Sequence, residues 1–188
     1  MFDRSQLPLQ PKAPGFAIVW VAAIAGLSVF LSLYFACVTP FVALAAVSAV
    51  VLPARMAAAS VFLAWLANQL VGYLVLDYPQ DWDSYAWGLV IAIAAFASLY
   101  AAMSVLRFRA NTAFTLVTAF FLGFAVYEAT LFAATAVLAS GEGAFSLPVI
   151  VQVFAINAAA AVSLLALHAA ASAARLVFAR KPKMVHAA

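Results

Sequence analysis

Long apolar runs, separated by short polar segments, dominate this sequence. Four of them have the roughly 20 residues that an α-helix needs to cross the hydrocarbon core of a bilayer, and they lie at 56–76, 84–106, 112–139 and 147–178. A fifth run, 16–38, is about 23 residues long and exceeds the roughly 7 to 15 apolar residues of a secretion signal. We therefore expect five retained membrane-spanning helices, of which the last two are long enough to tilt, kink or project from the membrane.

The stretch 39–54 is also apolar, but it is short and lies between Pro40 and Pro53. As a helix it would be only about 25 Å long. If it crosses the membrane and the N-terminus is cytoplasmic, all nine basic residues face the cytoplasm, whereas two fall on the wrong side if it does not cross. The sequence thus predicts six spans with both termini inside. The second span is expected to be tilted in locally thinned lipid or packed against the other helices.

Composition and organisation agree with an all-α, polytopic membrane protein. Apolar residues make up 69% of the 188-residue chain and charged residues 8%, against roughly 25% charged residues in soluble domains. A soluble enzyme, a disordered chain and a nucleic-acid binder are therefore excluded. We divide the chain into a proline-containing cytoplasmic lead (1–15), a single membrane domain (16–178) and a basic cytoplasmic tail (179–188).

The longer external loop combines aromatic rings with carboxylates. Its candidate ligand-binding residues are Tyr78, Asp81, Trp82, Asp83 and Tyr85. Rings at a membrane boundary are typical of an interfacial belt. Rings that alternate with carboxylates can also form a lid over a polar, ring-containing ligand. Both interpretations stay open.

Polar side chains also occur inside the predicted spans, where burial without a partner costs several kcal/mol. They are Asn68, Gln69, Glu128, Gln152 and Asn157. Measured along each helix, all of them fall within about 16 Å of its outer end, in the outer half of the bilayer. Trp65 and Gln69 share one helical face with Gly72, an arrangement that could line a cavity.

Glu128 is the single carboxylate at membrane depth, and Tyr127 stands next to it. The carboxyl group could be neutral, or ionised and paired with donors of a ligand. A proton-coupled carrier would also use such a group. Alternatively, Glu128 forms an interhelical hydrogen bond with Asn68, Gln69 or Asn157 and has a purely structural role.

No catalytic triad, glycine-rich phosphate loop or metal-ligand spacing occurs in the sequence. We therefore expect no enzymatic activity, no cofactor and no metal site, and we assign no role to His168 or His186.

The predicted topology and one sequence patch resemble a known family. Six short-looped spans, a brief second span and polar residues in the outer half resemble the substrate-binding S components of energy-coupling factor vitamin transporters. Within that group, residues 68–79 (NQLVGYLVLDYP) and 85–88 (YAWG) are similar to BtuM-type cobalamin proteins. The patch covers about 20 residues, and the rest of the likeness is topology alone.

This resemblance implies an uptake protein of a bacterial-type inner membrane. It would bind a vitamin-like molecule, such as cobalamin or a related corrinoid, and an energising membrane subunit would drive its movement. BtuM-type proteins use a cysteine near the external loop as a cobalt ligand, but this loop has none. Cys37, at the outer end of the first span, is the remaining candidate cobalt ligand. The rival hypothesis is a structural or assembly subunit of a larger membrane complex, contacting neighbouring chains and lipid.

Overall fold

A computed structural model describes residue 26 and residues 39–108, 112–139 and 143–179. These residues form five helices and no strand: α2 (Phe41–Val51), α3 (Ala54–Leu74), α4 (Trp82–Val105), α5 (Thr112–Ala134) and α6 (Leu147–Ala179). Four of the helices, α3 to α6, are long and apolar enough to cross a membrane. The expectation of an all-helical membrane protein is confirmed for this part of the chain. Apart from residue 26, the predicted span 16–38, with Cys37, lies outside the described residues, as do the lead 1–15 and residues 180–188 of the tail.

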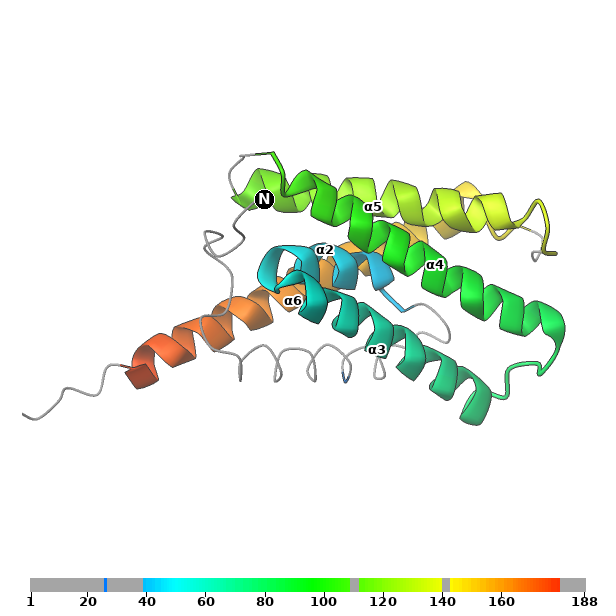
Figure 1. Ribbon diagram of the computed structural model, residues 1–188, viewed down its shortest axis with the longest axis horizontal. Helices are drawn as coiled ribbons and strands as arrows, with labels where there is room; N and C mark the ends of the chain where they lie inside the picture. The colour runs from blue at the N-terminus through cyan, green and yellow to red at the C-terminus, as the bar shows by residue number, and fades with distance from the viewer. Residues whose placement is uncertain (1–25, 27–38, 109–111, 140–142, 180–188) are drawn as a thin grey trace, which may run out of the picture.

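The four long helices surround the short one. Figure 1 shows α4 and α5 side by side, α3 along α4, and α6 crossing behind the bundle. Helix α2 lies in the middle and contacts each of the other four helices. The connections α3–α4 and α5–α6 lie at one end of the bundle, which we call the cavity end because of the site described below.

Helix α2 is the core of the bundle. No residue in it is more than 3% exposed, and its side chains are mainly Ala, Val and Leu. With 11 residues the helix is about 16 Å long, roughly half the thickness of the hydrocarbon core. Of the two expected arrangements for the short apolar stretch, the structure has the one packed against the other helices.

The prolines on either side explain why α2 is so short. Pro53 disfavours helical geometry at the residue before it, and Leu52 is accordingly extended, with φ −111° and ψ 154°. Pro53 also has no N–H to continue the helix. Leu52 still donates its backbone N–H to the Ser48 carbonyl at 2.9 Å, which closes the last turn. The chain then reverses directly into α3.

The long helices bury small residues and expose large apolar ones. Ala94, Ala95 and Ala102 of α4 are fully buried in the centre of the bundle, where small side chains let helices approach closely. Leu89 and Phe121, by contrast, are exposed on α4 and α5. Apolar side chains on both the inner and the outer face are what a bundle surrounded by lipid requires.

The helix ends differ from the predicted spans mainly in α5. Helix α5 ends at Ala134, whereas the apolar run continues to residue 139. Residues 135–137 instead form tight turns, in which the N–H groups of Thr135, Ala136 and Val137 each donate to the carbonyl three residues earlier. Helix α6 has 33 residues and is about 50 Å long, and its C-terminal end projects beyond the other helices (Figure 1). A long span was expected to tilt, to kink or to project, and α6 therefore projects.

A substitution at Gly123 tests the close contact between α4 and α5. A Cβ at this position would lie 2.8 Å from Ser98 Oγ and 3.5 Å from the Ser98 carbonyl oxygen. We expect Gly123→Leu to lower the free energy of unfolding by about 1–3 kcal/mol, because the side chain forces α4 and α5 apart. Thermal unfolding in detergent measures the effect. Val117→Leu, at an exposed position of the same helix, is the control, and an equal effect of both variants would contradict the contact.

Candidate functional site

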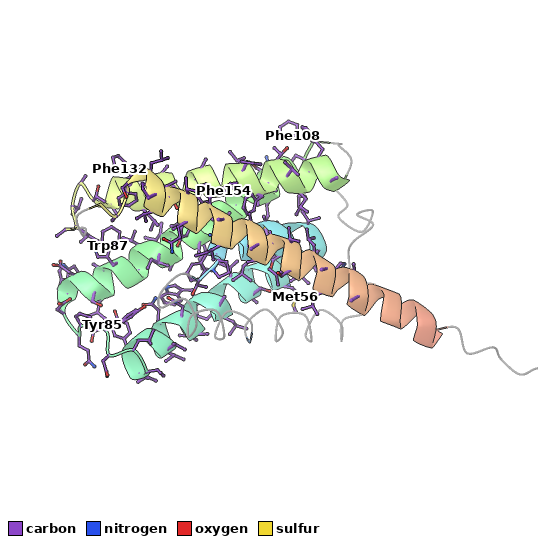
Figure 2. All side chains as sticks on the ribbon, turned by 180° about the vertical axis from the view of Figure 1, so that it is seen from behind. Met56, Tyr85, Trp87, Phe108, Phe132 and Phe154 are labelled. Carbon is purple, nitrogen blue, oxygen red and sulfur yellow. The ribbon has the colours of Figure 1, made fainter. Side chains whose placement is uncertain are left out.

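A cavity of about 470 Å³ lies at the cavity end of the bundle, beyond the N-terminus of α2. All five described helices and the α5–α6 connection contribute to its wall. The lining residues are Thr39, Phe41, Asn68, Trp87, Ile91, Tyr127, Glu128, Leu131, Ala139, Ala144, Phe145, Val149 and Val153. Figure 2 shows Trp87 at this end, near Phe132, and Phe108 at the opposite end. The cavity thus occupies the part of the bundle that the short α2 does not reach.

Glu128 is the charged residue of the cavity wall. It is half-buried, and its carboxylate has no hydrogen bond or ion pair with any residue in the described part of the chain. The interhelical hydrogen bond to Asn68, Gln69 or Asn157, one of the alternatives for Glu128, is not formed. A carboxylate at membrane depth that has no partner among the described residues needs one beyond them, such as water or a bound molecule.

Tyr127 places an aromatic ring beside Glu128. The residue is only 7% exposed, and its ring packs against Phe41 of α2 with the centroids 6.3 Å apart. Both rings belong to the cavity wall. This contact joins α5 to the first turn of α2, which forms the floor of the cavity. It fixes the position of the Tyr127 ring relative to that floor.

Asn68 is held by a chain of hydrogen bonds that begins at Gln69. The Gln69 side-chain amide donates to Asn68 Oδ1 at 3.1 Å, and Asn68 Nδ2 donates to Thr39 Oγ1 at 2.8 Å. Asn68 and Thr39 both line the cavity, whereas Gln69 stands behind them. Gln69 therefore orients a polar group of the wall without belonging to the wall.

The α5–α6 connection covers one side of the cavity. The Trp87 indole N–H donates to the Ala139 carbonyl at 2.9 Å, which ties the start of α4 to this connection. Phe145 packs edge-on against Phe132 at 5.5 Å. The residues 77–85, for which a ligand lid and an interfacial belt were both open interpretations, are absent from the lining.

Trp65, Gln69 and Gly72 do share one helical face, and that face packs against α4. The Trp65 indole N–H donates to the Gly88 carbonyl at 2.8 Å, and Gln69 Oε1 lies against Gly88, where a Cβ would collide with it. The space at Gly72 is filled by the Tyr78 ring. The gap that the sequence indicated is therefore a close contact between residues of the protein itself.

The tyrosines of the α3–α4 connection form a cluster outside the cavity lining. The Tyr73 ring lies 5.9 Å from Tyr78 and 5.2 Å from Tyr85, and the hydroxyl groups of Tyr73 and Ser84 are 3.1 Å apart. Asp77 takes a left-handed conformation with φ 52°, which turns the chain so that Tyr78 folds back over α3. The cluster joins the end of α3 to the start of α4.

The other predicted loop residues lie at the start of α4. Asp81 is its N-cap and accepts the Ser84 backbone N–H at 2.8 Å. Asp83 lies in the first turn, where a negative charge is favourable to the helix dipole. Trp82 is 77% exposed and Tyr85 is also exposed, in agreement with the interfacial belt.

Asn157 and Gln152 have different surroundings on α6. Asn157 is 1% exposed, and its Oδ1 accepts the backbone N–H of Ala43 in the first turn of α2 at 3.1 Å. Its Nδ2 donates to the Val153 carbonyl at 2.9 Å. Gln152 is exposed and does not line the cavity. Asn157 thus fixes the helix end that forms the cavity floor.

The sequence analysis missed the aromatic and aliphatic part of the wall. Trp87 enters the sequence-based expectations only as part of the segment 85–88, and no role was given to Phe41 or Phe145. A usable signal was the spacing of four residues between Trp87 and Ile91 and between Tyr127 and Leu131, which puts each pair on one face of a helix. Among the described residues no group of three or more His, Cys, Asp or Glu side chains could hold a metal ion, and Cys37 lies outside them.

Comparison of the chain with protein-family models, with curated proteins and with solved structures gives no match.

The hydrogen bond by which Asn157 caps the first turn of α2 can be tested by mutation. In Asn157→Leu the Ala43 N–H loses its acceptor inside the bundle, so we expect a loss of about 1–3 kcal/mol in the free energy of unfolding. Gln152→Leu, on the exposed face of the same helix, should change stability by less than about 0.5 kcal/mol. Thermal or denaturant unfolding in detergent gives both values. Similar stability of the two variants would show that the cap contributes nothing.

Proposed function

We propose that this membrane protein binds a vitamin-like small molecule in the cavity and takes part in its uptake. The observation that carries the proposal is the Glu128 carboxylate, which lines a cavity of about 470 Å³ and has no partner among the described residues. Ligand pockets in proteins typically measure about 300–1,000 Å³ and combine apolar walls with a few polar groups. A bound molecule would supply the donors that the carboxylate needs.

The proposal includes the arrangement in the membrane: six spans, both termini inside, in a bacterial-type inner membrane. Charge at the two ends of the bundle supports this orientation. Asp77, Asp81 and Asp83 are exposed at the cavity end, whereas the exposed Arg55 and Arg107 lie near helix ends on the opposite side. Basic residues favour the cytoplasmic side, so the cavity would face outward.

The likeness to S components of energy-coupling factor transporters suggests how uptake would proceed. The protein would recognise the molecule, and an energising membrane subunit would drive the movement of the bundle. No covalent chemistry by this chain is needed. A complete corrinoid, with its macrocycle and nucleotide tail, is large for a cavity of about 470 Å³, so the size favours a smaller molecule of the vitamin-like class.

The second candidate function is a structural or assembly subunit of a larger membrane complex. Two of the intramembrane amides favour it, because their hydrogen-bond partners lie within the protein. Gln69 is bound to Asn68, and Asn157 is bound to Ala43 and Val153. Glu128 and the cavity around it are what this alternative leaves without a role.

The orientation predicts which ends of the helices can be labelled from outside. In a Cys37→Ser background, we expect Gln80→Cys, at an exposed position of the α3–α4 connection, to react with a membrane-impermeant maleimide on intact cells. Phe108→Cys, exposed at the other end, should react only after the membrane is permeabilised. The reverse pattern would place the cavity on the cytoplasmic side and contradict the uptake direction.

Binding is tested by the thermal stability of the purified chain in detergent against a panel of vitamins and precursors, including cobalamin, cobinamide, thiamine and riboflavin. A ligand at a hundred times its Kd adds about 2.7 kcal/mol to stability. We expect at least one compound to raise the melting temperature of the native protein.

Two variants connect such a shift to the cavity. Ala144→Trp places a large side chain in the cavity wall and should abolish the shift, whereas Trp82→Ala, at an exposed position outside the wall, should keep it. If no compound stabilises a folded, monodisperse sample, the structural-subunit alternative is favoured and the binding proposal fails.

A further inference from the structure

The cavity combines several aromatic rings with a single formal charge. Its rings come from four separate segments of the chain: Phe41, Trp87, Tyr127 and Phe145. Glu128 is the charged residue of the lining, which includes no Lys, Arg or His among the described residues. A carboxyl group and several aromatic side chains around one cavity are a combination that can recognise positively charged organic groups.

We propose that the ligand of this cavity is a small organic cation, carrying a protonated amine or a quaternary ammonium group. This inference rests on the proposed binding function and narrows it to one chemical class. The cationic group would lie between the Glu128 carboxylate and the ring faces, and the rest of the molecule would contact the aliphatic wall at Leu131 and Val153.

Electrostatics in a low-dielectric site favours a cation over an anion. A carboxylate loses its hydration in such a site, and a positive ligand restores a compensating charge. An anionic ligand would instead place a second negative charge near Glu128, with no cationic side chain in the described lining to offset it. At a separation of a few ångströms this repulsion would strongly oppose the binding of an anion.

The N-terminus of α2 also faces the cavity, and its dipole has the opposite effect. A helix N-terminus carries a partial positive charge of about half a unit, against a full negative charge on an ionised carboxylate. Two of its N–H groups are already engaged, because Phe41 donates to the Thr39 carbonyl and Ala43 to Asn157 Oδ1. The carboxylate therefore determines the sign of the charge that the cavity prefers.

Neutral polar groups complete the site on the side of α3. Asn68 and Thr39 lie in the wall, and their amide and hydroxyl groups are oriented by the hydrogen bond between them. Such groups can contact a hydroxyl or amide of the ligand without changing the charge of the site. The cavity thus fits a molecule with one cationic group, an apolar or aromatic body and one further polar group.

A matched pair of ligands separates charge from shape. Choline and 3,3-dimethyl-1-butanol have nearly the same shape, but only choline is charged. We would measure the binding of both, and of thiamine as a larger ring-containing cation, to the full-length protein by isothermal titration calorimetry. We expect at least one of the two cations to bind, and any cation that binds to do so at least about tenfold more tightly than the uncharged alcohol.

Two carboxylate variants test the role of Glu128. Glu128→Gln should lower the affinity for the bound cation at least about tenfold and leave the affinity for the alcohol unchanged. Asp83→Asn, in the exposed first turn of α4, removes an equal charge outside the cavity and should change neither value. The melting temperature of each variant without ligand shows whether it is folded.

The outcomes distinguish this inference from the proposed function. If neither cation binds, but a neutral or anionic compound of the vitamin panel does so and loses its effect in Ala144→Trp, the cavity is a binding site and the cation inference is wrong. Equal binding of choline and the alcohol, or equal effects of Glu128→Gln and Asp83→Asn, would also overturn it. If no compound of either set binds, both proposals fail.

Discussion

The complete burial of α2 is the constraint on which the rest of this structure depends. An 11-residue apolar helix cannot cross a bilayer alone, and its backbone ends cannot be left in hydrocarbon. Four longer helices therefore surround it. Because α2 is about half as long as these helices, the interior of the bundle has a half that α2 fills and a half that it leaves unfilled. The cavity lies in the unfilled half, and the polar residues that hold the N-terminal end of α2 lie beside it.

Much of this architecture follows from the sequence because lipid imposes a simple rule. A segment that crosses a bilayer as a helix must be apolar over about 20 residues, so runs of this length identify α3, α4, α5 and α6 with small errors at their ends. The predicted C-terminal end of α5 was wrong by five residues. The sequence stays mainly apolar up to residue 139, so hydropathy does not reveal the tight turns that follow Ala134. The stretch 39–54 was ambiguous for the same reason: hydropathy does not distinguish a helix buried in protein from one facing lipid.

The site was predicted only in part. Asn68, Tyr127 and Glu128 line the cavity, and they were found because polar groups are costly at membrane depth. Gln69 meets the same criterion and Trp65 shares its helical face, but both contact Gly88, a pairing that depends on how α3 packs against α4. Phe41 and Phe145 escaped notice because an aromatic ring facing a cavity and one facing lipid look alike in an apolar sequence. Only the positions of the helices distinguish the two.

Helix α6 connects the cavity end of the bundle to the opposite end. Near one end it contributes Val149 and Val153 to the cavity, and Asn157 fastens it to α2. About 15 Å of helix lies on the cavity side of this attachment and about 33 Å on the other side. A small rotation about Asn157 would move the projecting end roughly twice as far as the cavity end. Such a rotation would also displace Ala160 and Leu164, which α6 buries in the core of the bundle, so a movement of α6 at the cavity end is coupled to the packing of the core and to the opposite end of the bundle.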